Sequence, residues 1–135
     1  MNFISPNEVS DEASCPLLVI SDADWRLRKS DQEFVERGLG YAEFDFYSWP
    51  NTVKGILRQN GFKKELLDKI VSVARSLHEI KKLILLIHIT EDQTEAIKDL
   101  RTAKDILAKD LPADLEIILA YSKATPHGLE YIILD

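Results

Sequence analysis

The chain has 135 residues, which is enough for one domain with a sizeable core and too few for two ordinary ones. Its hydrophobic fraction of 45% and charged fraction of 30% are typical of a soluble globular protein rather than a disordered chain. The formal net charge of −6 argues against nucleic acid and against an anionic membrane surface as partners, because both require a basic face.

Residues 1–14 are polar with scattered apolar positions and predict a flexible amino-terminal arm, followed by a single domain over residues 15–135. The arm carries acids and no basic residue, unlike a secretory signal. No apolar run approaches the roughly 20 residues of a membrane-spanning helix. Cys15 is the only cysteine and cannot form an internal disulfide, so we expect cytoplasmic residence. A partly buried thiol without a role is the interpretation we favour over a reactive one.

The first half of the domain predicts two strands around a helix. Leu17 to Ile20 form an aliphatic strand, and the helix spans Ser30 to Gly38, with Ser30 and Glu33 as a capping box. Phe34 and Val35 supply the buried face of this helix. The second strand, residues 42–48, alternates aromatic and polar residues and therefore reads as an edge strand.

The second half predicts three more helices and three more strands. Seven apolar residues form a stripe along the 64–78 helix: Leu66, Leu67, Ile70, Val71, Val73, Ala74 and Leu77. Thr90 or Asp92 caps a long helix whose buried stripe is Ile97, Leu100, Ala103, Ile106 and Leu107. In chain order the elements are a short helix 53–60, a helix 64–78, a strand 83–89, a helix to about 109, a strand 115–121, a loop 122–128 and a short strand 129–134.

Strands that alternate with helices favour an α/β fold with three layers, in which a mainly parallel sheet is flanked by helices. We predict a strand order of about 2-1-3-4, with the fifth strand as a short edge strand. Ligands of such sheets bind at the carboxyl ends of the strands.

Polar residues follow two of the buried strands. Asp22, Asp24 and Arg26 come after the first strand, and His88 and Glu91 come at the end of the 83–89 strand. If the two strands are neighbours, these five side chains converge at one crevice. Arg26 beside Asp24 would lower the pKa of that carboxyl and keep it ionised. Taken one at a time, strand-end polar residues more often cap helices and pair at the surface.

The other histidines and the tryptophans carry weaker signals. His78 lies near a helix carboxyl end, where its cation would favour the helix dipole, or it is simply exposed. His127 lies in a Pro-Gly loop, and we expect no catalytic role for it. Trp25 and Trp49 could line a pocket or an interface, but we favour core packing for both.

The two strand ends resemble those of β-class carbonic anhydrases. That family carries Cys-x-Asp-x-Arg after its first strand and His-x-x-Cys after its third. The matching segments here are Asp22-Ala23-Asp24-Trp25-Arg26 and His88-Ile89-Thr90-Glu91, and Ser48-Trp49-Pro50-Asn51 stands at the place of the family's small-residue loop. The resemblance covers about residues 17–122 and includes the order of strands and helices.

The resemblance implies roles for these residues. In the family, two cysteines and one histidine bind zinc, and the Asp–Arg pair orients the metal-bound water. Asp24 and Arg26 would then be the catalytic pair and His88 a metal ligand, with Asp22 and Glu91 at the two cysteine positions. Carboxylates are harder ligands with a weaker preference for zinc than thiolates. The site could bind one divalent ion (zinc, manganese or iron), or it could have lost metal and left acids that share a proton.

Two functions follow from the resemblance. The one we favour is a carbonic anhydrase-like protein with a degenerate metal site, which lacks ordinary carbonic anhydrase activity and acts by binding or assembly, with a small molecule as a further expected ligand. The alternative is a metal-dependent lyase or hydrolase in which Asp22, His88 and Glu91 hold the ion and Asp24 accepts a hydrogen bond from its bound water, acting on carbon dioxide or a similar small substrate. The family also implies a homodimer, to which Phe3, Trp25 or Trp49 could contribute.

Unrelated α/β functions remain a third alternative. The five glycines form no dinucleotide or Walker pattern, and no Gly-x-Ser-x-Gly elbow is present. Asp22 and Asp24 would suit a magnesium-dependent phosphoryl-transfer site. Its usual lysine and hydroxyl partners are represented only by Ser122-Lys123 after the fourth strand.

Overall fold

The fold is built on one five-stranded sheet with the order β2-β1-β3-β4-β5. The computed structural model describes residues 1–58, 62–90 and 92–134. Strands β1 to β4 are parallel, and β5 is antiparallel to β4, which confirms the predicted topology. The strands are β1 (Leu17–Asp22), β2 (Asp45–Trp49), β3 (Lys82–Ile89), β4 (Glu116–Thr125) and β5 (Gly128–Leu134).

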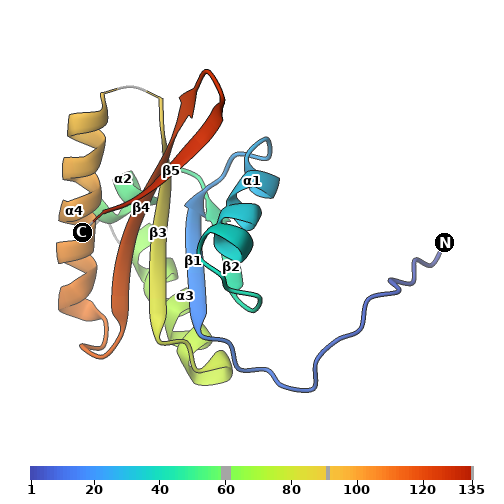
Figure 1. Cartoon of the computed structure of the whole chain (residues 1–135). Helices are drawn as coiled ribbons and strands as arrows, with labels where there is room; N and C mark the ends of the chain where they lie inside the picture. The colour runs from blue at the N-terminus through green and yellow to red at the C-terminus, as the bar shows by residue number, and fades with distance from the viewer. Residues whose placement is uncertain (59–61, 91, 135) are drawn as a thin grey trace.

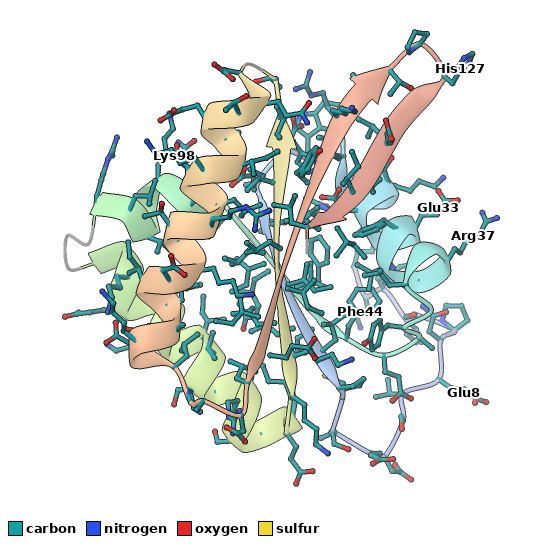
Figure 2. All side chains as sticks on the ribbon, turned by 60° about the vertical axis from the view of Figure 1, so that its left-hand side comes forward. Glu8, Glu33, Arg37, Phe44, Lys98 and His127 are labelled. Atoms are coloured by element: carbon teal, nitrogen blue, oxygen red, sulfur yellow. The ribbon has the colours of Figure 1, made fainter. Side chains whose placement is uncertain are left out.

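Helices cover both faces of the sheet, which gives the three layers (Figure 1). One face carries α1 (Arg28–Glu33) and the short π-helix η1 (Phe34–Gly38) that continues it. The other face carries α2 (Thr52–Arg58), α3 (Phe62–His78) and α4 (Gln93–Asp110). Charged side chains such as Lys98, Glu33 and Arg37 point outward from these helices, while side chains fill the space on both sides of the sheet (Figure 2).

The core sits on both faces of β1 and β3 because these central strands carry unbroken aliphatic runs, Leu17–Ile20 in β1 and Leu83–Ile87 in β3. On β1, Leu18 and Ile20 pack toward α2, α3 and α4, whereas Leu17 and Val19 pack toward α1 and η1. All four side chains are at most 1% exposed. A strand buried on both faces needs such a continuous apolar run, and the same run brings the polar residue that follows it to the sheet edge.

The helix stripes are confirmed for α4 and only in part for α3. Leu100, Ala103 and Leu107 of α4 are fully buried, with Ile97 and Ile106 packed beside them. On α3, Val73 and Leu77 are 50% and 63% exposed, so these two predicted stripe positions were wrong. The apolar face of α3 is wider than the part of that helix that packs on the sheet, and Val73 and Leu77 lie outside the packed part.

The first helix begins two residues earlier than predicted, and the capping box is wrong. Leu27 is the N-cap and makes no side-chain capping hydrogen bond. The Leu27 amide donates to the Asp24 carbonyl at 3.0 Å, and the Asp31 amide donates to the Leu27 carbonyl at 2.8 Å, so the chain turns into a helix directly after the loop. Ser30 therefore lies inside the helix, and Asp31 faces the sheet with only 2% exposure.

The predicted loop over residues 122–128 is mostly strand. β4 continues to Thr125 because it pairs with β5, with Thr125 opposite Gly128. The turn holds only Pro126 and His127, with His127 at the tip of the hairpin (Figure 2). The Thr125 hydroxyl donates to the Gly128 carbonyl at 2.8 Å, and Gly128 adopts a φ of 128°, which favours glycine.

Residues 1–14 form neither helix nor strand and run away from the sheet (Figure 1). Phe3 is 85% exposed there. Within the described ranges, no helix is both long and apolar enough to cross a bilayer. Core packing was the wrong expectation for Trp25, which is 81% exposed. Trp49 is partly buried and lines a small hollow, but it is not part of either core cluster.

Candidate functional site

The carboxyl ends of β1 and β3 lie side by side and form the candidate site. The two strands pair directly, with Ser21 opposite Leu86. β1 is also the point where the chain switches direction across the sheet, since it has β2 on one side and β3 on the other. Such switch points leave a crevice beyond the strand ends where ligands bind.

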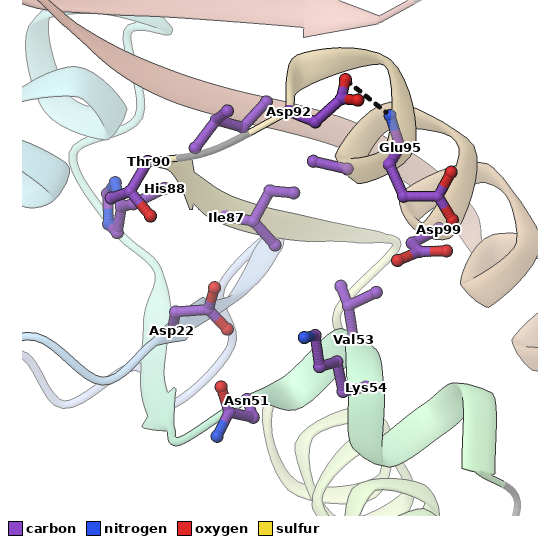
Figure 3. A pocket seen from close by; sticks show the side chains of 12 residues that line it. Asp22, Asn51, Val53, Lys54, Ile87, His88, Thr90, Asp92, Glu95 and Asp99 are labelled. Carbon is purple, nitrogen blue, oxygen red and sulfur yellow. Dashed lines mark hydrogen bonds between the residues drawn. The ribbon is translucent and has the colours of Figure 1, made fainter.

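A cleft of about 360 Å³ opens at this edge, between the strand ends and the helices α2 and α4. Asp22 and Lys54 lie on one side, and Glu95 and Asp99 of α4 lie on another (Figure 3). Its lining combines charged and polar residues with apolar ones: Asp22, Asn51, Val53, Lys54, Ile87, His88, Ile89, Thr90, Asp92, Glu95, Ala96 and Asp99. A second, adjoining hollow of about 260 Å³ is lined by Asp22, Asp24 and His88 among others.

Asp22 is a partly buried carboxylate of the cleft. Burial raises its pKa above the ordinary value of 3.8, and a hydrogen bond from a backbone amide and the nearby imidazole only partly oppose this. The backbone amide belongs to Thr52 at the start of α2, 3.3 Å from the carboxylate. This bond ties the end of β1 to the first turn of α2.

Asp24 and Arg26 form the predicted pair. The guanidinium donates from Nε and from Nη2 to the two carboxylate oxygens, at 3.0 and 2.7 Å. These hydrogen bonds, with one from the Arg26 amide, lower the pKa of Asp24 to about 2. The carboxylate is therefore ionised at neutral pH, as the spacing predicted. Its catalytic role stays a prediction.

His88 is held by the protein through both ring nitrogens. Nδ1 contacts the hydroxyl of Ser122, its neighbour across β3 and β4. Nε2 lies 3.0 Å from the carboxylate of Asp31 on α1. Because an ionised carboxylate only accepts, Nε2 donates to Asp31, and the Ser122 hydroxyl occupies the other ring nitrogen, Nδ1.

The network extends to β5. The Tyr131 hydroxyl donates to the other oxygen of Asp31 at 2.6 Å, and Tyr131 stands opposite Ser122 in the β4–β5 register. His88, Ser122 and Tyr131 thus lie side by side on β3, β4 and β5. Asp31 contacts two of them, His88 and Tyr131, from α1. The ring of Phe34 stacks on Tyr131 with centroids 4.5 Å apart. Burial and the hydrogen bond to Asp31 both raise the pKa of Tyr131.

Ser122, His88 and Asp31 are linked by hydrogen bonds in the same sequence as a catalytic serine–histidine–carboxylate triad. Here Nδ1 contacts the serine and Nε2 contacts the carboxylate, whereas a typical triad uses the two nitrogens the other way round. A nucleophile must reach its substrate, but Ser122 is only 1% exposed and does not line the cleft. The side chains of His88 and Asp31 are 9% and 2% exposed. The arrangement therefore serves to fix His88 and to fasten α1 on the sheet.

The predicted metal ligands are brought together only in part. Asp22 and His88 line the same cleft, and Glu91 lies outside the described residues. Strand alternation places Asp22 on the α2–α4 face and His88 on the α1 face, so they approach the edge from opposite sides. A metal at this site would have to take His88 from Ser122 or Asp31. The metal site stays a prediction.

The phosphoryl-transfer alternative receives no partner at the cleft from β4. Ser122 lies beneath His88, and Lys123 points to the other face, where its amine is 3.8 Å from Glu130. Asp31 and Tyr131 were not predicted as site residues, and Ser122 was named only as a candidate partner in phosphoryl transfer. The signal in the sequence was faint: an acid on the inner face of a short helix, and a serine and a tyrosine at alternating positions of strands.

A separate cluster of residues that could bind a metal lies at the opposite end of the strands, near the amino ends of β1 and β2. Cys15, Asp45 and His78 each present one ligand atom, and these three atoms lie within 4.8 Å of one another, so they could hold a metal ion. His78 Nδ1 and the Asp45 carboxylate are 2.5 Å apart. His78 is therefore paired with an acid rather than simply exposed.

The chain was compared with protein-family models, with curated protein sequences and with solved structures, and none of the three comparisons finds a match.

Proposed function

We propose that this domain acts by binding a small, positively charged molecule in the cleft at the carboxyl ends of β1 and β3, and that it does not hydrate carbon dioxide. The observation that carries the proposal is the engagement of both ring nitrogens of His88 by Ser122 and Asp31. An imidazole held in this way has no lone pair directed at the cleft for a metal, and it has no free nitrogen for proton transfer.

The charge of the cleft supports a cationic ligand. Among the residues that the structure describes, four carboxylates line it, from Asp22, Asp92, Glu95 and Asp99, against one ammonium group, that of Lys54. Asp92 is already used as the N-cap of α4, since its side chain accepts from the Thr94 amide at 2.9 Å. Asp22 likewise accepts from the Thr52 amide, so Glu95 and Asp99 are the main carboxylates left to meet a ligand, with Asp22 beside them. The volume of 360 Å³ is at the lower end of small-molecule pockets and suits a ligand such as a short diamine.

This proposal retains the resemblance to β-class carbonic anhydrases as a proposed kinship. In it, the thiolate positions have become Asp22 and Glu91, and the hydrating site has been converted into an acidic binding cleft. The change from thiolate to carboxylate weakens zinc binding while it keeps negative charge at the same edge. We further propose a cytoplasmic homodimer, for which the exposed Trp25 is a candidate contact.

A metal-dependent lyase or hydrolase is the second candidate. It is favoured by the adjoining hollow, which Asp22, Asp24 and His88 share. In this function Asp22, His88 and Glu91 would hold the ion, and Asp24, kept ionised by Arg26, would accept a hydrogen bond from bound water. Before an ion could bind there, the His88 side chain would have to rotate away from Ser122.

The test compares a matched set of probes by isothermal titration calorimetry: cadaverine as the dication, 1-pentylamine as the monocation and glutarate as the dianion. We expect cadaverine to bind more tightly than pentylamine, and glutarate not to bind. The Asp99→Asn variant should weaken cadaverine at least tenfold, whereas Asp105→Asn, an exposed acid on the same helix, should not. Equal binding of all three probes, or equal effects of the two variants, would refute the proposal.

Stopped-flow measurement of carbon dioxide hydration separates the two candidates. The binding function predicts a rate no higher than that of buffer, with or without added zinc. Hydration above buffer that is lost in His88→Gln would instead support the metal-dependent enzyme. Sedimentation velocity at increasing protein concentration tests the homodimer, and a species that stays monomeric throughout would contradict it.

A further inference from the structure

Cys15, Asp45 and His78 come from three segments that meet at the amino ends of β1 and β2, far from the cleft. Cys15 precedes β1, Asp45 is the first residue of β2, and His78 is the last residue of α3. Asp45 stands opposite Leu18 in the β1–β2 register. The sheet thus fixes the first two segments relative to each other, and α3 delivers the third.

The backbone also holds this cluster in place. The Cys15 amide donates to the His78 carbonyl at 2.8 Å, which joins the end of α3 to the start of β1. The chain then leaves the helix through Glu79, whose φ of 56° is unusual for a residue with a side chain. This sharp exit leaves His78 with its ring directed toward Asp45, 2.5 Å away.

We propose that the thiolate of Cys15, the carboxylate of Asp45 and Nδ1 of His78 bind one zinc ion, with water in the fourth position. The donor set of sulfur, nitrogen and oxygen suits zinc, which accepts all three and favours four tetrahedral ligands. Bonds of about 2.3 Å to sulfur and about 2.0–2.2 Å to nitrogen and oxygen place neighbouring ligand atoms roughly 3.3–3.8 Å apart. The three atoms lie within 4.8 Å of one another, so only side-chain rotations are needed.

The surroundings favour a cation at this point. Burial is the main reason that the pKa of Cys15 is raised, and the negative charges of Asp45 and Glu43 raise it further. The same negative charges attract a metal ion, and the carboxyl end of α3 adds the negative pole of the helix dipole. The side chains of His78 and Asp45 are 35% and 25% exposed, which leaves a path for the ion and room for its water.

Binding requires the loss of one proton. The thiol proton leaves to solvent when the Cys15 sulfur bonds to zinc. The proton that His78 Nδ1 donates to Asp45 must also leave that atom, and in the neutral ring it moves to Nε2 without a net release. The hydrogen bond between His78 and Asp45 is replaced by two bonds to the metal. The ion would then cross-link β1, β2 and α3, and it would shield Cys15 from oxidation.

Cobalt is the probe that reports the thiolate directly, because a cobalt–thiolate bond produces a charge-transfer band in the near ultraviolet. The full chain is stripped of metal under reducing conditions and titrated with cobalt, then with zinc. We expect the band to saturate at one equivalent of cobalt and to be lost when zinc displaces it. One zinc per chain should also raise the melting temperature.

The variants assign the site. Cys15→Ser should abolish the band, and His78→Gln and Asp45→Asn should each weaken cobalt binding at least tenfold. His127→Gln, which changes the exposed histidine at the hairpin tip, is the matched control and should leave the titration unchanged. Circular dichroism checks that each variant is folded. Asp22→Asn should also leave the band unchanged, because the cleft is a different site, and this separates the present proposal from the proposed function.

Two outcomes would overturn the proposal. One is the absence of a thiolate band in the folded wild-type chain at millimolar cobalt. The other is a band that persists at one equivalent in His78→Gln and Asp45→Asn with unchanged affinity, which would indicate a thiolate that binds cobalt without its two neighbours.

Discussion

Replacement of Asp31 by alanine tests the buried network most directly. Asp31 accepts from His88 Nε2 at 3.0 Å and from the Tyr131 hydroxyl at 2.6 Å, and it is 2% exposed. The alanine variant leaves the imidazole of His88 and the partly buried hydroxyl of Tyr131 without this partner. Each such orphan costs about 1–3 kcal/mol, so the free energy of unfolding should fall by roughly 2–6 kcal/mol. That loss is a large fraction of the stability of an ordinary domain.

The assay is equilibrium unfolding in urea, followed by circular dichroism, on the wild type and four variants: Asp31→Ala, Glu33→Ala, Tyr131→Phe and the double variant of Asp31 and Tyr131. Glu33→Ala is the matched control on the same helix, because Glu33 pairs with Arg37 at the surface and should cost below about 0.5 kcal/mol. Tyr131→Phe removes one donor and should cost about 1.5–3 kcal/mol. The double variant should cost less than the sum of the two, because the orphaned hydroxyl is gone.

The reasoning fails if Asp31→Ala unfolds at the same urea concentration as Glu33→Ala, or if the double variant is strictly additive. If Asp31→Ala does not fold, Asp31→Asn takes its place in the cycle. Its amide oxygen can accept from only one of the two donors in this geometry, so a smaller loss with the same coupling to Tyr131 is expected.

Three further predictions concern pH and packing. Because burial raises the pKa of Asp22 in the folded state, its contribution to stability is present below about pH 3.8 and is lost as the pH rises through the folded value; Asp22→Asn should therefore be at least as stable as the wild type at pH 7, and urea midpoints of the two should converge at acidic pH. Asp24 has the opposite sign: its pKa of about 2 means that the pairing with Arg26 is fully present above about pH 3.8 and is lost as the pH falls toward 2, and NMR titration of Arg26→Ala should return the Asp24 pKa toward 3.8. Leu100→Ala, at a site with no exposure, should cost about 2–5 kcal/mol in urea unfolding, whereas Leu77→Ala, 63% exposed, should change the midpoint little; comparable losses would mean that α3 is packed differently.

Local sequence determined the elements and much of their arrangement. The aliphatic runs Leu17–Ile20 and Leu83–Ile87 favoured strands buried on both faces, and such strands need helices on both sides of a parallel sheet. The Asp24–Arg26 pair was also predictable, since both residues lie in one short loop and pair across two positions. Interactions of this range depend on few neighbours.

The limits of the strands and helices depended on partners elsewhere in the chain. β4 extends past Tyr121 and through Ser122 because β5 pairs with it. The residues after Tyr121 are typical of a loop, so the sequence did not indicate this pairing. Val73 and Leu77 are apolar, yet they lie outside the arc of α3 that meets the sheet. Apolar periodicity marks a helix face, but contact with the sheet decides how much of that face is buried.

The side-chain sites were decided by tertiary structure alone. Asp31 and His88 are 57 positions apart, and Asp31 and Tyr131 are 100 positions apart, so no local pattern joins them. The same holds for Cys15, Asp45 and His78: the sequence favoured no role for Cys15 and a helix-end position or exposure for His78, and it did not single out Asp45. The function of a polar side chain depends on the groups that face it in the folded protein. Strand register and helix placement determine which groups these are. The sequence by itself determined which segments would be buried, whereas only the packed sheet decided which of its few buried acids and imidazoles would meet.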